Sequence, residues 1–167
     1  MINRVWAMPN KHTFDIKPIN ELIQKYLQHN QVSIDPFANK SKLASITNDL
    51  DPQYNTDYNM DALNFLKIFA DNSVDMVLYD PPYSPRQVAE SYKKMQMTVN
   101  MQTTQASYWS NQKTEIGRIV RSGGYVITCS WNSGGIGKKY GFELIEVLLV
   151  PHGGWHNDTI VVVEGKV

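Results

Sequence analysis

The stretch that decides the fold of this chain is Val74-Asp75-Met76-Val77-Leu78-Tyr79-Asp80-Pro81-Pro82-Tyr83-Ser84. Its apolar half predicts a buried parallel strand that ends at an acid. The two prolines stop the strand, because proline has no N–H for the ladder and restricts the residue before it to extended conformations. The result is a stiff turn at the carboxyl end of a strand, where open α/β sheets bind their ligands.

The residues on this turn suit the handling of an exocyclic amino group. Such a nitrogen on a base is a poor nucleophile, because its lone pair is delocalised into the ring. The Asp80 carboxylate can accept one of its N–H groups and the Pro81 carbonyl the other, which aims the lone pair at an electrophile. Tyr83 can stack on the face of an unstacked base. The alternative is a proline-rich strand–loop junction without chemistry.

Four residues, Asp80, Pro81, Pro82 and Tyr83, resemble the Asp-Pro-Pro-Tyr motif of amino-group DNA methyltransferases, which methylate adenine N6 or cytosine N4. The resemblance implies that these four residues are catalytic, that S-adenosylmethionine (SAM) is the cofactor, and that Asp80 also lies against it. It further implies an α/β fold of the Rossmann-like class I methyltransferase type, with a mostly parallel sheet and a C-terminal antiparallel hairpin. The chain looks most like short phage-type adenine methyltransferases.

Length and composition are those of a globular protein. The 167 residues suffice for one domain, 1–167, without a separate target-recognition domain. No apolar run approaches the ~20 residues of a membrane span, and the N-terminus lacks the apolar core of a signal peptide. Cys129 is the only cysteine, so no internal disulfide can form. We therefore expect a soluble cytoplasmic protein with no membrane contact.

The charge distribution bears on the substrate. The formal net charge is zero, whereas proteins that bind nucleic acid usually have a basic footprint. Residues 84–167 nevertheless carry 9 basic and 6 acidic side chains. If DNA is the partner, we expect this later half to contact it. A homodimer would give such a small protein more surface for DNA.

An upstream set of residues resembles the joined SAM-binding motifs of the same methyltransferases. Residues 14–29 are expected to contain an amphipathic helix with Pro18 in its first turn. Residues 32–37 are expected to form a short strand that leads into Asp-Pro-Phe-Ala. The resemblance implies that four residues here belong to the cofactor site, the last two near the methionine end of SAM: Lys17, Pro18, Asp35 and Phe37.

The chain then departs from the family pattern. Asn39 and Ser41 stand where the family has two glycines, which let the backbone adopt positive φ and approach the ligand. Asparagine tolerates left-handed conformations better than most residues, so we expect Asn39 to keep the turn and to stay in the cofactor site. Few residues separate this turn from the next expected strand, 44–48, so the first crossover helix is expected to be shortened.

Two acids are candidates for binding the nucleoside part of SAM. Asp49 follows the second strand, where an acid in nucleoside-binding α/β folds accepts hydrogen bonds from ribose hydroxyls. The alternative is a solvated loop acid or a helix cap. Asp61 begins a segment that resembles the family segment whose Asp contacts the adenine amino group. Asp is also common in a first helical turn, because it favours the positive end of the helix dipole.

The second half of the chain completes the expected sheet. We expect helices over 84–94 and 105–121, a strand over 125–131, and a hairpin from strands 142–150 and 159–164. Residues 95–104 lack periodicity and are expected to form a loop beside the active site.

Three loop features have both a functional and a structural interpretation. Arg86 could neutralise a phosphate or pair with Glu90 one turn on. The glycine-rich turn 132–139 could hold substrate backbone, with Lys138 and Lys139 at phosphates, or it could simply lead into a short helix. In the hairpin loop, Trp155 or His156 is expected to contact an extruded base, and no metal site is expected, because no set of ligands has the spacing of a zinc site.

Together these features predict an enzyme that moves the SAM methyl group to an exocyclic amino nitrogen of a DNA base, with adenine N6 as the first choice. One alternative is a methyltransferase-fold module that binds SAM or DNA without turnover, which the lost glycines and the short crossover favour. The other keeps the chemistry but changes the acceptor to cytosine N4, RNA or a protein glutamine.

Overall fold

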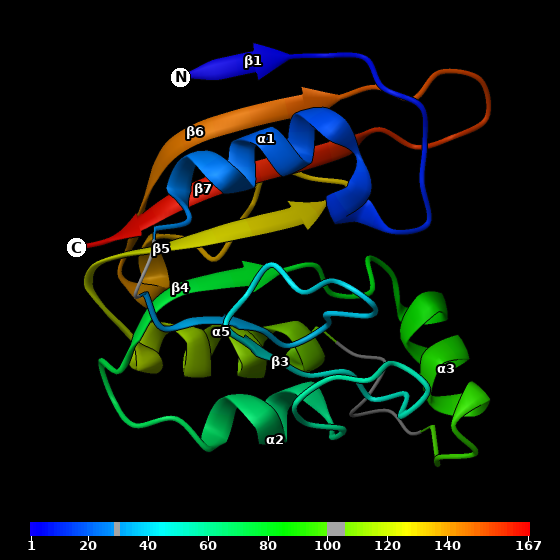
Figure 1. Cartoon of the computed structure of the whole chain (residues 1–167), viewed down its shortest axis with the longest axis vertical. Coiled ribbons are helices and arrows are strands. Elements are labelled where there is room, and N and C mark those ends of the chain that lie inside the picture. The colour runs from blue at the N-terminus through cyan, green and yellow to red at the C-terminus, as the bar shows by residue number, and fades with distance from the viewer. Residues whose placement is uncertain (29–30, 100–105) are drawn as a thin grey trace.

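The computed structural model describes residues 1–28, 31–99 and 106–167, and its centre is a seven-stranded sheet (Figure 1). The strands lie in the order β1-β6-β7-β5-β4-β2-β3. Only β7 runs antiparallel to its neighbours. This confirms the expected α/β fold with a mostly parallel sheet and a final antiparallel hairpin. The strands are β1 Ile2–Arg4, β2 Ser33–Asp35, β3 Ile46–Thr47, β4 Val74–Tyr79, β5 Val120–Ser130, β6 Phe142–Val150 and β7 Thr159–Lys166.

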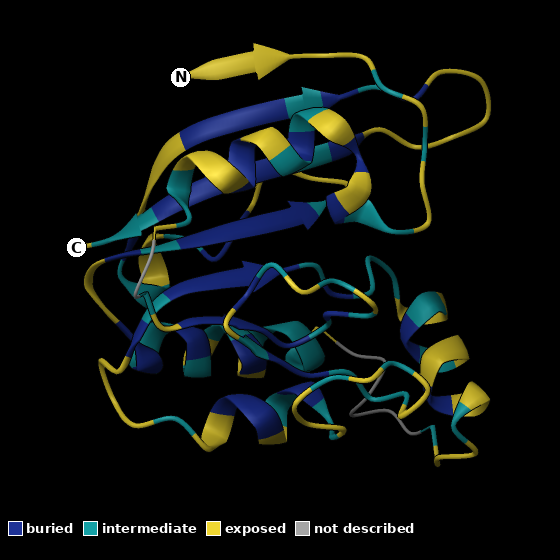
Figure 2. Ribbon diagram, viewed as in Figure 1, coloured by how far each residue is buried: buried dark blue, intermediate teal, exposed yellow. Residues whose placement is uncertain are grey.

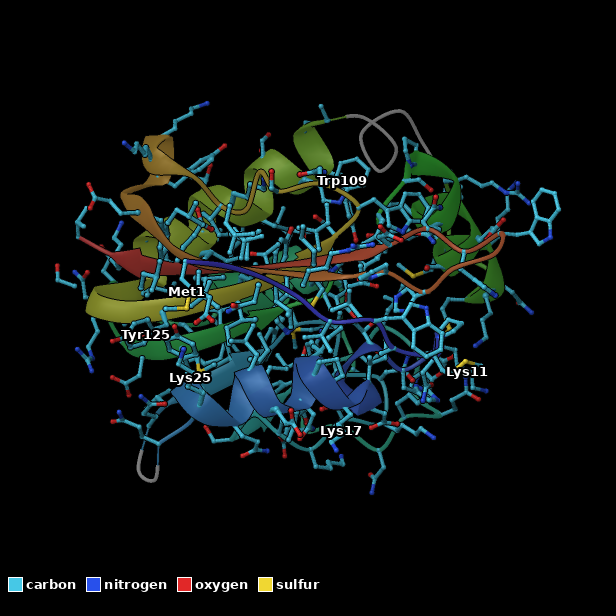
Figure 3. The ribbon with its side chains drawn as sticks, turned by 90° about the horizontal axis from the view of Figure 1, so that it is seen from above. Met1, Lys11, Lys17, Lys25, Trp109 and Tyr125 are labelled. Carbon is cyan, nitrogen blue, oxygen red and sulfur yellow. The ribbon has the colours of Figure 1, made fainter. Side chains whose placement is uncertain are left out.

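Helices cover both faces of the sheet, as the view from above in Figure 3 shows for α1 and α5. Helix α1 packs on one face, and α2 and α5 pack on the other. Helix α3 lies beyond the carboxyl end of β4 (Figure 1). The helices are α1 Lys17–Tyr26, α2 Ala62–Lys67, α3 Pro85–Lys94 and α5 Ser107–Ile119, with 3-10 turns η1 Thr13–Asp15 and η2 Lys138–Tyr140.

Strand β4 lies in the middle of this three-layered arrangement. Met76 and Leu78 belong to the core under α1, whereas Val77 and Tyr79 belong to the core under α2 and α5. Successive side chains of a strand point to opposite faces, so a strand that is covered on both faces reads as one apolar run. Figure 2 shows β4 and β5 as buried strands in the interior.

The strand order reverses between β2 and β4. From β2 the chain moves outward to β3 and then returns to the other side of β2 to form β4 and β5. Ligands of open α/β sheets bind outside the carboxyl ends of strands at such a reversal. Asp35 is the last residue of β2, and Asp80 directly follows β4. The fold therefore places two of the expected site acids at this point.

The first crossover is even shorter than expected. Residues 36–45 contain turns and no helix between β2 and β3. The two strands are joined instead by side-chain bonds: Ser33 N–H donates to Ser45 Oγ at 3.0 Å, and Ser45 N–H donates to Ser33 Oγ at 2.9 Å. This confirms the shortened crossover. The expected helix within 14–29 is also confirmed, with Ile19, Leu22 and Ile23 as its buried positions.

Two expected boundaries were wrong, and one strand was not expected. The first dozen residues contain a strand, β1, which pairs parallel with β6; its residues are all exposed and so carry no buried pattern. Strand β3 has two residues rather than the five expected over 44–48. Strand β5 begins at Val120, directly after α5, because residues 122–124 form an irregularity inside the strand and do not end it.

Two further observations concern the whole described chain. Among the residues that the structure places, no helix is long and apolar enough to cross a membrane. Cys129 is fully buried in the core under α1.

Candidate active site

One candidate site is a cavity of about 270 Å³ outside the carboxyl ends of β2, β3 and β4. We call it the first cavity. Five carboxylates line it, those of Asp15, Asp49, Asp51, Asp61 and Asp80. The rest of its wall consists of residues 11–14, 36–41 and 50 together with Tyr54, Ala62, Pro82, Ser91, Tyr92, Lys94, Met95 and Tyr108.

Asp35 lies fully buried at the end of β2, directly before the wall residues Pro36 and Phe37. Its Oδ1 accepts the backbone N–H of Phe37 at 3.0 Å. Its Oδ2 is buried and has no hydrogen-bond partner among the described residues. Burial, with smaller contributions from Asp80 and Asp49, raises the pKa of Asp35 well above its usual value. A buried carboxylate with a free oxygen is suited to a ligand that brings N–H or O–H donors.

The turn after β2 keeps its shape without the two glycines. Asn39 has φ of 56°, so it adopts the left-handed conformation that was expected of it. Its backbone N–H donates to Asp49 Oδ2 at 2.9 Å, while Asp49 Oδ1 accepts the N–H of Asp51 at 2.9 Å. Burial raises the pKa of Asp49. The turn and the acid after β3 thus form one hydrogen-bonded unit on the wall of the first cavity.

Asp61 has a structural role and also faces the cavity. It is the N-cap residue of α2, where its Oδ1 accepts the N–H of Leu63 at 3.0 Å. Its Oδ2 accepts the hydroxyl of Tyr92 from α3. Tyr92 lines the same cavity, and burial followed by the bond to Asp61 raises its pKa.

The segment 11–15 also lines the first cavity, although no motif in the sequence pointed to it. Phe14 is buried under α1, and the side chain of Asn20 on α1 donates to the Phe14 carbonyl at 3.1 Å, which holds the segment in place. His12 has a buried ring nitrogen, Nδ1, without a partner among the described residues. Burial, then Lys40 and Lys11, lower the pKa of His12.

The Asp-Pro-Pro-Tyr turn forms the end of the first cavity. The hydroxyl of Tyr83 donates to Asp80 Oδ1. Burial raises the pKa of Asp80 to about 6, and the nearby hydroxyls of Tyr83 and Thr13 act in the opposite direction. Burial and then Asp80 raise the pKa of Tyr83. Asp80 is therefore a carboxylate that can change its protonation state near neutral pH.

A second cavity, also of about 270 Å³, lies on the other side of this turn. Asp80 lines the first cavity, Pro81 and Tyr83 line the second, and Pro82 lines both. The four residues of the motif therefore stand where the two cavities meet. The remaining wall of the second cavity consists of Tyr79, Pro85, Trp109, Lys113, Thr128, Ser130, Asn132 and Gly135.

Neighbouring aromatic rings hold the turn on the side of the second cavity. Trp109 Nε1–H donates to the Pro82 carbonyl at 2.9 Å. The ring of Tyr83 meets the ring of Trp131 edge to face, with centroids 5.5 Å apart. The backbone N–H of Tyr83 donates to Gln87 Oε1 at 2.6 Å. These contacts fix the positions of the Pro82 carbonyl and of the Tyr83 ring.

Some expected site residues lie outside both cavities. Lys17 and Pro18 begin α1 and line neither; the Lys17 side chain is exposed and lies 3.9 Å from Glu21. Arg86 pairs with Glu90 at 2.8 Å, which is the structural alternative for it. Lys138 and Lys139 are exposed in η2 and line neither cavity.

The hairpin loop is also remote from both cavities. Trp155 and His156 are exposed and line neither. His152 is buried, and its ring nitrogens bond to the Ala7 carbonyl at 2.9 Å and to Thr159 Oγ1 at 2.8 Å. Within the described residues, no group of three His, Cys, Asp or Glu side chains could hold a metal ion. Part of the expected loop 95–104, residues 100–104, lies outside the described residues.

The two cavities together can hold two reactants on either side of one turn. The first has acceptor oxygens and negative charge, which suit a ligand with donors and a positive charge. The second has aromatic rings and a lysine. Between them stand a carboxylate and proline carbonyls that can accept N–H groups.

Comparisons with known proteins concern the fold. No protein-family model matches the chain, and no curated protein sequence matches it either. Among solved structures it is similar to 1,6-didemethyltoxoflavin-N1-methyltransferase from Burkholderia thailandensis with bound 1,6-didemethyltoxoflavin and S-adenosylhomocysteine, with a TM-score of 0.59 and 10% identity over 90% of this chain and 77% of that one. It is similar to TrmN from Thermus thermophilus, with a TM-score of 0.57 and 16% identity over 91% of this chain and 49% of that one.

A third similar structure is a SAM-dependent methyltransferase from Methanosarcina mazei, with a TM-score of 0.56 and 12% identity over 87% of this chain and 97% of that one. These likenesses show that the chain has the Rossmann-like fold of methyltransferases. They leave the acceptor open, because at 10–16% identity they show the fold alone.

Proposed function

We propose that the chain is a SAM-dependent methyltransferase that acts on an exocyclic amino nitrogen of a DNA base, with adenine N6 as the first choice. One observation carries the proposal: the Asp80 to Tyr83 turn stands where two cavities meet, with Asp80 in one and Pro81 and Tyr83 in the other. An amino group that reaches this turn from the second cavity faces a ligand held in the first. The methyltransferase fold of the similar structures supports the same reaction class.

The residues of the first cavity fit SAM. SAM brings a cationic sulfonium, an ammonium group, two ribose hydroxyls and an adenine amino group, all of which interact well with carboxylates. Asp49 would accept from the ribose and Asp61 from the adenine amino group. Asp35 is fully buried, lines neither cavity and directly precedes the wall residue Pro36 in the chain; its free Oδ2 would accept from the ammonium group. Phe37 and Asn39 would shape the wall around them. When bound, SAM supplies a methyl group that is already activated for transfer.

Lys17 and Pro18 would support this cofactor site indirectly. They are the first two residues of α1. This helix holds the segment 13–16 in two ways: the side chain of Asn20 donates to the Phe14 carbonyl, and backbone N–H groups in the first turn donate to the Ile16 carbonyl. That segment lines the first cavity. The role of the two residues would therefore be to place the wall, since their side chains do not reach it.

Catalysis would come from orientation and charge. With Asp80 Oδ1 bonded to Tyr83, its Oδ2 would accept one N–H of the acceptor amine and the Pro81 carbonyl would accept the other. Asp80 and the Pro81 carbonyl would thereby hold the nitrogen with its lone pair toward the first cavity, where SAM would supply the methyl group. Asp80, with a pKa of about 6, would accept the proton that the nitrogen must lose.

A base in DNA fits the second cavity for two reasons. The rings of Tyr83 and Trp109 line it and offer faces and edges for an unstacked base. Among the described residues that line it, the one charged side chain is a lysine, from the half of the chain with the excess of basic residues. We also propose that residues 1–167 act as one domain, since every described strand belongs to one sheet.

The test is methyl transfer from SAM with a labelled methyl group to unmethylated duplex DNA, with RNA in parallel. The product nucleosides are identified by mass spectrometry. We expect N6-methyldeoxyadenosine. N4-methyldeoxycytidine or a methylated ribonucleoside would change the acceptor and keep the reaction, whereas no product with any acceptor, despite binding of S-adenosylhomocysteine (SAH), would replace the enzyme by a binding module.

A further inference from the structure

The two cavities differ in charge. The first has five carboxylates and three lysines on its wall, Lys11, Lys40 and Lys94, whereas the described wall of the second has no carboxylate and one lysine, Lys113. Each wall attracts ligands of the opposite charge and repels ligands of its own charge. The two adjoining cavities therefore favour different ligands. The second cavity is thus suited to a molecule that presents electron-rich atoms.

Lys113 is held in this cavity by the glycine-rich turn that follows β5. It lies half-buried on α5, and its Nζ donates to the Gly135 carbonyl at 2.5 Å. Burial lowers the pKa of Lys113, and the carboxylate of Glu164 acts in the opposite direction. An ammonium group has three donors, so the bond to Gly135 leaves others for a ligand.

Glu164 fixes the turn that holds the lysine. Its carboxylate accepts the N–H of Ile136 at 2.6 Å and that of Gly137 at 2.9 Å. Gly135 has φ of +54°, and a Cβ built on it would lie 2.4 Å from Glu164 Oε2. A side chain at position 135 would therefore displace the Glu164 carboxylate that holds the turn.

Thr128 adds a second polar group to the same wall. It lies on β5 opposite Tyr79 of β4, and both residues line the second cavity. Its side chain is 4% exposed, and its Oγ1 has no hydrogen-bond partner among the described residues. A buried hydroxyl costs free energy unless it is hydrogen-bonded. It is therefore a group that a ligand in the cavity would satisfy.

We propose that Lys113 and Thr128 form a subsite that binds an electron-rich oxygen of the methyl acceptor while its amino group lies at Asp80. The inference rests on the proposed function and adds a requirement to it. Deoxyadenosine has no such oxygen apart from its sugar hydroxyls. An adenine nucleotide brings one in its phosphate, and deoxycytidine brings one in its base carbonyl. The subsite therefore selects nucleotides or carbonyl-bearing bases over a bare adenine nucleoside.

The experiment compares the binding of three probes to the full chain saturated with SAH, by chemical-shift titration. The probes are deoxyadenosine, deoxyadenosine 5′-monophosphate and deoxycytidine. We expect Lys113→Met to weaken the binding of a probe that has the oxygen about tenfold or more, as the loss of a charge-assisted hydrogen bond does, and to leave deoxyadenosine within about twofold. Loss confined to the monophosphate identifies a phosphate, and loss confined to deoxycytidine identifies a carbonyl.

Two further variants separate the subsite from unspecific effects. Lys138→Met removes a lysine from the same turn that is exposed and lines neither cavity, so it should leave all three affinities unchanged. Thr128→Val keeps the shape without the hydroxyl and should weaken the same probe as Lys113→Met by a smaller factor. Equal weakening of all three probes by Lys113→Met, or no weakening, overturns the subsite.

The outcome is independent of turnover. If the wild type transfers no methyl group but Lys113→Met still selectively weakens one probe, the subsite stands and the proposed function fails. If the wild type methylates DNA and Lys113→Met has no selective effect, the subsite alone fails. If the wild type binds none of the three probes, the subsite and the proposed class of acceptor are both overturned.

Discussion

Asp80 combines two properties that are seldom found in one carboxylate. It stands at the boundary of two cavities, and burial raises its pKa to about 6. On sequence alone no general base with a suitable pKa was apparent, because a pKa depends on the burial of the group and on its neighbours in space. The structure shows both the burial of Asp80 and its neighbours. The Asp80 carboxylate can therefore accept the N–H of the amine and then the proton that the amine loses.

The first prediction concerns pH. Only ionised Asp80 accepts an N–H, so kcat/KM for methyl transfer should fall about tenfold per pH unit below about pH 6 and level off above it. The pH profile of steady-state transfer measures this. Burial also raises the pKa of Asp35 and Asp49, so the dissociation constant of SAH is followed over the same range. A rate that stays constant down to about pH 5 would contradict the role of Asp80.

The second prediction concerns the left-handed residue of the cofactor turn. Asn39→Gly should bind SAH within about twofold of the wild type, because glycine adopts a φ of 56° without strain. Asn39→Val should weaken SAH about tenfold, because a β-branched residue pays roughly 1–2 kcal/mol for this conformation. Calorimetric titration with SAH measures both. Equal affinity of the valine variant would show that the turn does not shape the cofactor site.

At the scale of elements, a charged hydrogen-bond network ties α1 and the edge strand β1 to β6. Glu146 on β6 is buried and accepts from Lys25 at 2.7 Å, from Tyr26 at 2.9 Å and from Asn3 at 3.0 Å. It lies at the register shift between β6 and β7. Because α1 holds the wall segment of the first cavity, this network supports the site from a distance.

The third prediction tests this network by stability. Lys25 and the other donors lower the pKa of Glu146, so its contribution is present above the ordinary pKa of 4.5 and is lost as the pH falls. Glu146→Gln should lower the free energy of unfolding by about 1–3 kcal/mol at neutral pH and by much less in acid. Denaturant unfolding measures it, with Glu143→Gln, an exposed residue of the same strand, as the control. Equal effects of the two variants at neutral pH would contradict the network.

The sequence predicted an element well when the residues of that element carry a clear pattern, and poorly when the element depends on contacts with distant residues. Strand β4 and the turn after it were predicted, because a buried run followed by two prolines has few other solutions. Strand β1 was missed, because its three residues are exposed and only the pairing with β6 makes them a strand. The start of β5 was misplaced because the glycines at 123 and 124, which usually end a strand, lie here in an irregularity opposite Asp75.

At the scale of the whole molecule, the same distinction applies to the site. Three of the five acids of the first cavity, Asp49, Asp61 and Asp80, could be predicted, because each follows a strand or caps a helix in a recognisable motif. The segment 11–15 and the wall of the second cavity could not, since Trp109 and Lys113 reach the Asp80 turn only through the packing of α5 on the sheet. For Lys17 and Pro18 the motif was found in the sequence, but their side chains line neither cavity.

The fourth prediction uses Asp80→Asn, which keeps the shape of the side chain and removes its charge. Its fold should be at least as stable as the wild type at about pH 8, because a carboxylate whose folded-state pKa is raised costs stability as the pH rises through that pKa. Thermal unfolding checks this. A marked loss of stability would mean that Asp80 has a structural role that the account does not include.

The most direct measurement of the central claim is single-turnover methyl transfer by wild type and Asp80→Asn, with the dissociation constant of SAH for each. The account predicts that transfer falls about a hundredfold or more while the affinity for SAH changes by no more than about threefold. That result would place the action of Asp80 on the amine at the meeting point of the two cavities. Undiminished transfer by Asp80→Asn, or loss of SAH binding in proportion to the loss of transfer, would contradict it.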